Sequence, residues 1–267
     1  MKQNKIGILG CGWLGFPLAK NLIKQGFKIK GSTTNKEKIK SLEKENIEPY
    51  LIEIGENKDS KSLDSFLEKL DILILNIPPK LRSNIKSNYF EKVKFIKNSK
   101  NFDKVKHLVF ISSTSVYGSK QGKINSKTIP VPDSKSGKEI LKVEQLFKEE
   151  NNTIIRFGGL IGNKRNPLKY LKEKNEILNP EALINYIHLN DCIGIINSII
   201  EKNIWGKTFI GVSPYHPSKK EYYDKLCTEK NLNKLNFSSK ETTVNKEIND
   251  ENILKILNYK FKNPKFN

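Results

Sequence analysis

The feature that most constrains this chain is a glycine-rich turn, 10-GCGWLG-15, near its start. An apolar run, Ile6–Leu9, precedes the turn, and a helical pattern over 15–25 follows it. A strand, a Gly-x-Gly-x-x-Gly turn and a helix in this order are typical of a nucleotide-binding βα unit, although a tight turn without a ligand gives the same string. In such a unit Gly10 permits the turn, Gly12 lets the backbone approach a pyrophosphate, and Gly15 lets helix and strand pack closely.

The start of the following helix supplies the binding chemistry of this turn. Backbone N–H groups at a helix start have no partner inside the helix, and the helix dipole adds partial positive charge there. Phosphates are bound at such positions. We therefore expect the backbone at Trp13 and Leu14 to hold the pyrophosphate of a dinucleotide together with the glycines of the turn.

Strand-like and helix-like segments alternate along the first part of the chain. Six strands are predicted, at Ile6–Leu9, Phe27–Gly31, Leu51–Ile54, Leu70–Ile77, His107–Ser112 and Thr153–Phe157. Helical patterns separate most of them, over about 15–25, 36–46, 83–100 and 136–150. Such alternation is typical of a parallel sheet with right-handed crossovers. The expected fold class is α/β, a Rossmann doubly wound parallel sheet with a small C-terminal substrate cap.

The alternating pattern loosens beyond residue 165. A strand-like segment at Tyr186–Leu189, a helix over 190–202 and a strand at Thr208–Val212 are separated by irregular stretches. A segment of this size does not bury an independent core of its own. We predict a dinucleotide-binding domain over 1–165 and a C-terminal cap region over 166–267, with about 185–202 returning to the Rossmann core.

Composition narrows the class of protein. The formal net charge is +19, but lysines are spread along the chain and mixed with glutamates, and arginine occurs only at 82, 156 and 165. A nucleic-acid-binding face clusters arginine and interleaves aromatic residues, so we interpret the charge as a solvated lysine-rich surface and expect no nucleic-acid partner. No apolar run approaches the roughly 18 residues of a membrane span.

The cysteines and histidines are scattered. The three cysteines (Cys11, Cys192 and Cys227) and the three histidines (His107, His188 and His216) show no metal-ligand spacing. The odd number of cysteines implies no disulfide framework, and we expect no metal site. A reducing, cytoplasmic location is the default expectation for such a chain.

The end of the second predicted strand selects between NAD and NADP. An acidic residue there binds the ribose 2′-hydroxyl of NAD. This chain has 31-GSTTNK-36 instead, so the hydroxyls of Ser32, Thr33 and Thr34, with Lys36 close by, are expected to accept the 2′-phosphate of NADP. The alternative is a polar turn followed by a helix N-cap at Thr34 or Asn35. NADP is the preferred cofactor, and NAD is the other candidate.

Further candidates lie after the predicted strands, because open α/β sheets bind ligands at the carboxyl ends of their strands. Ser112 and Ser113 follow the fifth strand, and Ser113 can donate a hydrogen bond to a substrate carbonyl or hydroxyl. The remaining cofactor candidates are Asn76, Ile77 and Pro78 after the fourth strand and Arg156 in the sixth. The substrate candidates are Gly158, Gly159 and His188.

Six motifs in order resemble the extended short-chain dehydrogenase/reductase superfamily. They are GCGWLG, GSTT, ISSTSVYG (111–118), IIRFGGLIG (154–162), YIHLNDC (186–192) and LNYKF (257–261). They are most similar to its bacterial atypical branch, the NAD(P)-binding, nucleoside-diphosphate-sugar epimerase-like proteins. The resemblance covers nearly the entire chain. It implies a nucleotide bound by the first half and a substrate enclosed by the C-terminal part.

The same resemblance exposes a departure. Working members of the superfamily combine the serine that matches Ser113 with a Tyr-x-x-x-Lys pair, in which the tyrosine is the general acid/base. If Glu144 matches the glutamate that usually follows this pair, Ser136 replaces the tyrosine and Ile140 the lysine. A serine hydroxyl does not take over that role unaided, and Tyr117 of the VYG motif is the other candidate for it.

Two hypotheses from different classes follow. The first is an NADP-dependent oxidoreductase or epimerase/dehydratase that acts on a polar small molecule such as a nucleotide sugar, with an unconventional acid/base. The second is a catalytically silent NADP-binding sensor or interaction protein, which the missing Tyr-Lys pair favours. The sequence does not indicate an oligomeric state.

Overall fold

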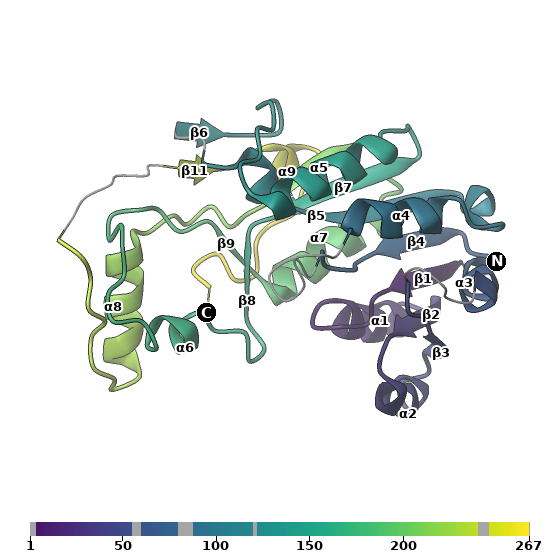
Figure 1. Ribbon diagram of the computed structural model, residues 1–267, viewed down its shortest axis with the longest axis horizontal. Helices are drawn as coiled ribbons and strands as arrows, with labels where there is room; N and C mark the ends of the chain where they lie inside the picture. Colours follow the sequence, from purple (N-terminus) through teal and green to yellow (C-terminus); the bar gives the residue numbers. More distant parts are fainter. Residues whose placement is uncertain (1–3, 55–59, 80–87, 120–121, 240–245, 267) are drawn as a thin grey trace.

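A seven-stranded parallel sheet with strand order β10-β7-β5-β4-β1-β2-β3 forms the centre of the molecule (Figure 1). The computed structural model describes residues 4–54, 60–79, 88–119, 122–239 and 246–266. The strands are β1 (Lys5–Leu9), β2 (Lys28–Thr33), β3 (Glu48–Leu51), β4 (Ile72–Leu75), β5 (His107–Ser113), β7 (Asn152–Phe157) and β10 (Thr208–Gly211). The strand order reverses between β1 and β4, so the sheet is doubly wound and the expected fold class is confirmed.

Helices cover both faces of this sheet. The first face carries α1 (Gly15–Lys24), α2 (Ile39–Glu43), α7 (Leu189–Glu201) and α9 (Asn252–Lys255). The second carries α3 (Ser60–Leu67), α4 (Tyr89–Lys97) and α5 (Lys135–Leu146). Alternate residues of each strand serve the two cores: Ile6 and Ile8 of β1 pack toward the first face, and Leu9 packs toward the second. Burial on both faces explains why the central strands are almost continuously apolar.

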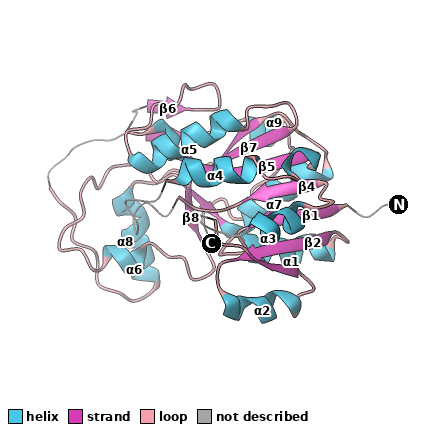
Figure 2. Cartoon of the chain, turned by 45° about the vertical axis from the view of Figure 1, so that its right-hand side comes forward, coloured by secondary structure: helices cyan, strands magenta, loops and turns pink. Residues whose placement is uncertain are grey.

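A smaller lobe lies beyond the sheet, on the side away from the N-terminus (Figures 1 and 2). It contains α6 (Leu168–Leu171), α8 (Lys219–Glu229) and the strand pair β8 (Gly159–Ile161) and β9 (Tyr186–His188). A second short pair, β6 (Gly122–Ile124) and β11 (Lys246–Ile248), joins the middle of the chain to its end. The lobe has a small apolar cluster of its own, made of Ile161, Leu168, Ile184, Tyr223, Cys227 and Phe266.

The segment after β9 packs into the main core. Helix α7 buries one side against α1 and the first face of the sheet, and β10 joins the sheet as its edge strand. The buried carboxylate of Asp191 accepts hydrogen bonds from the Tyr259 hydroxyl (2.8 Å) and the Lys262 N–H (2.6 Å). Because both partners lie in the C-terminal segment, this carboxylate holds the end of the chain against α7.

Several predicted elements differ from those in the structure. The third strand lies at Glu48–Leu51, so the prediction of Leu51–Ile54 was wrong. An edge strand tolerates Pro49 and polar residues, which weakens its apolar signal. Helix α3 and the short strands β6, β8 and β11 were not predicted. Of the predicted helix over 83–100, the structure contains α4, and residues 80–87 lie outside the described residues.

Within the described ranges, no helix is long and apolar enough to cross a bilayer. The same residues contain no group of His, Cys, Asp and Glu side chains that could hold a metal ion. All three cysteines are buried and unpaired.

Candidate cofactor site

The glycine-rich turn lies at the carboxyl end of β1. Gly10 has φ +112°, and a Cβ there would lie 2.5 Å from the carbonyl oxygen of Asn76. A Cβ on Gly15 would lie 2.2 Å from the carbonyl oxygen of Gly10. A Cβ on Gly12, in contrast, would meet no heavy atom within 4 Å. Gly10 and Gly15 are therefore required by the fold itself, whereas Gly12 leaves open space in front of the turn.

Polar groups from the neighbouring strands hold this turn in place. The Gly10 N–H donates to the Ser32 hydroxyl oxygen (2.9 Å), and the Asn76 side-chain amide donates to the Gly10 carbonyl (3.0 Å). The Cys11 N–H donates to the Ser32 carbonyl (2.8 Å). Burial raises the pKa of the Cys11 thiol to about 12, so this thiol stays protonated and serves as an apolar contact. Ser32 and Asn76 thus position the phosphate-binding backbone.

Helix α1 begins directly after the turn without a counter-charge. Its N-cap residue, the buried Leu14, provides no side-chain hydrogen bond, and its first turn contains no acidic residue. The positive end of the helix dipole therefore faces the open space at Gly12 without a neutralising side chain of the helix. An anion in that space would receive backbone N–H groups, so these residues fit the pyrophosphate of a dinucleotide.

The residues at the end of β2 have partners within the fold. Ser32 is buried and its hydroxyl oxygen accepts from the Gly10 N–H, and its role as a ligand of the 2′-phosphate stays a prediction. The Thr33 hydroxyl oxygen accepts from the Asn35 N–H (3.1 Å). Asn35 caps the 3₁₀ helix η1 (Lys36–Lys38) by accepting from the Glu37 N–H (2.8 Å). Thr34 and Lys36 are exposed beside this cap.

A buried ion pair lies beside the serine-containing segment at the end of β5. The Arg156 guanidinium forms a bidentate pair with Glu144 through Nε (2.9 Å) and Nη2 (2.6 Å). Its Nη1 donates to the Tyr117 hydroxyl (2.7 Å), and the Ser112 hydroxyl donates to Glu144 (2.5 Å). Tyr117 in turn donates to the Asn125 carbonyl (3.2 Å). This buried network ties β5, β7 and α5 together.

Three candidate residues belong to this network, and their side chains have partners that differ from those expected from the sequence. Ser112 and Arg156 were expected to contact the cofactor, but their side chains are buried and bonded to Glu144. Tyr117 was a candidate acid/base, but it is fully buried, and burial raises the pKa of its hydroxyl. All three side chains therefore hold the serine segment in position, and we propose no ligand contact for them.

Ser113 and Ser136 lie on two elements that pack together. The hydroxyl oxygen of Ser113 accepts from the Ser115 N–H (3.1 Å) at the start of the 3₁₀ helix η3 (Thr114–Tyr117), which leaves its own proton available. Ser136 lies in the first turn of α5. The next residue, Gly137, packs so closely that a Cβ there would lie 2.5 Å from the Ser115 carbonyl oxygen. Both serines are half-buried.

The candidate substrate residues contact other parts of the fold. A Cβ on Gly158 would lie 2.5 Å from the Asn185 carbonyl oxygen, and one on Gly159 would lie 2.4 Å from the Tyr186 ring. The absent side chains of these glycines thus make room for the chain before β9. His188 caps α7 by accepting from the Asn190 N–H (3.2 Å).

After β4, the Ile77 carbonyl accepts from the Tyr89 hydroxyl (3.0 Å), and Pro78 is exposed next to it.

The structure also brings together residues that the sequence analysis did not connect. The Trp13 indole N–H donates to the Asn163 carbonyl (3.0 Å), and the Arg165 guanidinium carbon lies 5.3 Å from the Trp13 ring centroid. The segment 162–165 therefore lies against the glycine-rich turn. The only signal in the sequence is the Gly-Asn pair, which is typical of a tight turn but does not identify its partner.

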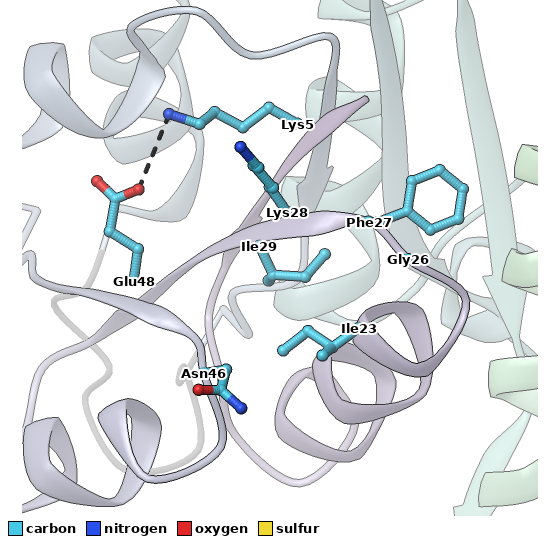
Figure 3. A pocket seen from close by; sticks show the side chains of 8 residues that line it. All are labelled: Lys5, Ile23, Gly26, Phe27, Lys28, Ile29, Asn46 and Glu48. Carbon is cyan, nitrogen blue, oxygen red and sulfur yellow. Dashed lines mark ion pairs between the residues drawn. The ribbon is translucent and has the colours of Figure 1, made fainter. Parts of the chain in front are cut away.

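A large surface hollow, of about 510 Å³, lies elsewhere (Figure 3). It is formed at the amino ends of β1 and β2 by Ile23, Phe27, Ile29 and neighbouring polar residues. An ion pair between Lys5 and Glu48 (3.8 Å) crosses its rim. Because the glycine-rich turn is at the carboxyl ends of the strands, this hollow is separate from the candidate cofactor site.

Comparison with known proteins supports the cofactor assignment. Residues 5–124 match the family described as the NAD binding domain of 6-phosphogluconate dehydrogenase. Protein YeeZ of Escherichia coli (strain K12) is 27% identical over 268 residues, which cover 98% of this chain and 97% of YeeZ.

Solved structures confirm the fold. UDP-glucuronic acid 4-epimerase from Bacillus cereus, in complex with UDP-glucuronic acid and NAD, has a TM-score of 0.77 and 19% identity, covering 97% of this chain and 94% of that chain. A short-chain dehydrogenase/reductase superfamily protein from Agrobacterium tumefaciens with bound NAD has a TM-score of 0.77 and 14% identity, covering 97% and 93%. These likenesses confirm the expected α/β fold over nearly the whole chain.

Replacement of Gly12 should separate binding from folding. We expect Gly12→Ala to unfold at the wild-type temperature, because its Cβ meets open space. Gly10→Ala should lose about 1–3 kcal/mol of stability, because it combines a strained backbone with a steric overlap. Thermal and urea denaturation measure the stability of the two variants. Titration with NADPH measures the cofactor affinity of Gly12→Ala. Equal destabilisation by the two variants would contradict the geometry of the turn.

Removal of one partner of the buried ion pair should be costly. We expect Glu144→Gln to lose about 3–5 kcal/mol of unfolding free energy, because the Arg156 charge remains buried without its carboxylate. Glu149→Gln is the matched control, since Glu149 pairs with Lys97 (3.0 Å) at the surface and such pairs contribute only ~0–1 kcal/mol. Urea denaturation of both variants measures the difference, and similar losses would refute a structural role for the network.

Proposed function

We propose that this chain, whose fold is that of the short-chain dehydrogenase/reductase superfamily, is an NADP(H)-dependent enzyme of the oxidoreductase or epimerase type. It acts on a hydroxyl or carbonyl group of a polar small molecule. The observation that carries the proposal is the glycine-rich turn, in which Gly12 faces open space at the uncapped start of α1. When bound there, the dinucleotide supplies hydride transfer, which the side chains of the protein do not provide.

The preference for NADP rests on the residues after β2. The strand ends at Thr33, and the exposed residues that follow are Thr34, Asn35 and Lys36 rather than a carboxylate. A second exposed lysine, Lys38, follows in the 3₁₀ helix η1. The Thr34 hydroxyl and these lysines suit a 2′-phosphate, whereas a carboxylate would bind a ribose 2′-hydroxyl.

Ser113 is the residue to which we assign a catalytic role. Ser113 donates its hydroxyl proton to the reacting oxygen, for which its geometry leaves it available. The Tyr-x-x-x-Lys pair is absent from α5, since Ser136 stands at the tyrosine position and the buried Ile140 at that of the lysine. Proton transfer therefore proceeds through water or through a group outside α5.

The class of substrate is inferred from the relatives. The epimerase from Bacillus cereus was solved with UDP-glucuronic acid and NAD together. This chain has the same fold, with a lobe of α6 and α8 beyond the sheet. These likenesses support a nucleotide sugar as substrate. The three unpaired thiols are consistent with a reducing, cytoplasmic location.

A second candidate function is a catalytically silent NADP-binding sensor or interaction protein. It is favoured by the substitutions at Ser136 and Ile140, which remove the usual proton donor while leaving the phosphate-binding turn intact. An enzyme oxidises or reduces its cofactor in the presence of a substrate, whereas a sensor only binds it.

The choice of cofactor is tested by calorimetric titration with NADPH and NADH. We expect the wild-type protein to bind NADPH more tightly. Thr34→Asp should shift the ratio of the two dissociation constants by about tenfold or more toward NADH, because the carboxylate repels the 2′-phosphate and accepts from the ribose hydroxyl. Ser41→Asp, at an exposed position of α2, is the charge-matched control. Equal affinities in the wild type and no shift in Thr34→Asp would reject the preference.

Catalysis is tested by following the absorbance of reduced nicotinamide against a panel of nucleotide sugars and polar ketones. With an active substrate, Ser113→Ala should lower kcat about 100-fold or more, as expected for removal of a donor to a developing oxyanion. Ser119→Ala, at an exposed position after η3, is the matched control. Tight NADPH binding without turnover of any substrate would favour the sensor.

A further inference from the structure

The segment between β8 and α6 forms a tight turn over the cofactor loop. Gly162 and Arg165 exchange backbone hydrogen bonds of 3.1 and 2.9 Å, and Asn163 and Lys164 between them have positive φ values of 39° and 66°. Trp13 fastens this turn to the glycine-rich loop through its bond to the Asn163 carbonyl (3.0 Å). A piece of the C-terminal half thereby becomes a neighbour of the phosphate-binding backbone.

Arg165 carries an exposed positive charge at this contact. Its guanidinium lies over the Trp13 indole, and in the described part of the chain it forms no ion pair with a carboxylate. The charge therefore lies beside α1, whose start also lacks a carboxylate in its first turn.

Residue 165 is an arginine in a chain whose cationic residues are nearly all lysines. The chain contains 48 lysines and arginines, of which arginine occupies only 82, 156 and 165. Arg156 is committed to Glu144, and Arg82 lies outside the described residues. A guanidinium stacks on an indole and presents a planar fork to phosphate oxygens, which a lysine ammonium does not. Trp13 thus orients a group that is suited to a diphosphate.

We infer that Arg165 binds the diphosphate of the dinucleotide, with Trp13 as the positioning residue that orients its guanidinium. The turn 162–165 is then a second wall of the site, opposite the backbone N–H groups at the start of α1. This inference rests on the proposed function, because it requires that NADP(H) occupies the glycine-rich turn. It adds a side chain from outside the N-terminal βα unit to that site.

The test uses Trp13 as its own reporter. The chain has two tryptophans, and Trp205 stacks on His107 with ring centroids 4.1 Å apart at the start of β5. Trp205→Phe retains an aromatic ring there and leaves Trp13 as the sole tryptophan. In this background Arg165→Ala, Arg165→Lys and the matched control Lys164→Ala are titrated with NADP⁺ by calorimetry and by Trp13 emission. Thermal unfolding of each variant shows that it is folded.

We expect Arg165→Ala to raise the dissociation constant for NADP⁺ by about tenfold or more, as for a lost charge-assisted hydrogen bond. Arg165→Lys should fall between it and the wild type, and Lys164→Ala should change the constant by less than about twofold. Adenosine 2′-monophosphate, which lacks the diphosphate, should bind all variants alike. Trp13 emission should respond to NADP⁺ and not to this mononucleotide.

The titration results that contradict this inference are distinct from those that contradict the proposed function. If NADP⁺ binds the wild type and Arg165→Ala equally, the inference is wrong while the proposed function stands. If Lys164→Ala weakens binding as much as Arg165→Ala, a general charge effect replaces the specific contact and the inference is overturned. Uridine diphosphate is titrated in parallel: if Arg165→Ala weakens the binding of uridine diphosphate and not that of NADP⁺, Arg165 serves the diphosphate of a substrate and the inference is also wrong. Absence of any NADP⁺ or NADPH binding to the wild type overturns both proposals.

Discussion

The turn at Gly10 is the point at which the carboxyl ends of β1, β2 and β4 meet, and the geometry of the candidate site follows from it. Its N–H is bonded to the Ser32 hydroxyl and its carbonyl to the Asn76 amide. Ser32 lies in β2 and Asn76 directly follows β4, so the loop is bonded to the central sheet. Bonds within the fold thus fix the backbone next to Gly12, which lowers the ordering cost of binding a ligand there.

A second constraint acts where the catalytic serine is expected. The Arg156–Glu144 pair is buried, and it lies among hydroxyl groups that satisfy its remaining hydrogen-bonding capacity. Breaking such a pair by removing one partner is far more costly than forming it is favourable. These bonds together fix the path of the backbone from β5 through η3. Ser113 lies at the carboxyl end of β5, an internal strand of the sheet, directly after a residue of this network.

The two halves of the candidate site differ in how closely they follow the superfamily. The phosphate-binding turn is complete, and a tryptophan–arginine contact from the C-terminal half adds to it. In α5, Ser136 and Ile140 stand at the positions of the tyrosine and the lysine if Glu144 matches the glutamate of the superfamily, and Ile140 packs in the core under the helix. Under the proposed function, this arrangement keeps the backbone that would hold a dinucleotide and requires another route for proton transfer. This contrast is why cofactor binding and turnover are separate questions for this protein.

Local sequence was sufficient for the elements whose cause is local. The glycine-rich turn, the central strands and the alternation of strands and helices depend on periodicity and on backbone freedom, both of which can be identified in the sequence. The edge strand at Glu48–Leu51 was misplaced because an edge needs little apolar content. The short pairs β6–β11 and β8–β9 join segments distant in the chain, and no local pattern specifies such partners.

The sequence by itself determined the Rossmann fold, the position of the glycine-rich turn and the absence of a tyrosine between Tyr117 and Tyr170, because each depends only on residue types and their spacing. Only the tertiary structure decided how polar side chains are used. Ser32, Arg156 and Tyr117 were expected at a ligand, but their partners inside the fold engage them, whereas Arg165 lies beside the turn. The physical reason is that a hydrogen bond or ion pair forms only between groups that the fold brings within about 3–4 Å of each other. The separation of two residues along the chain does not give their distance in space.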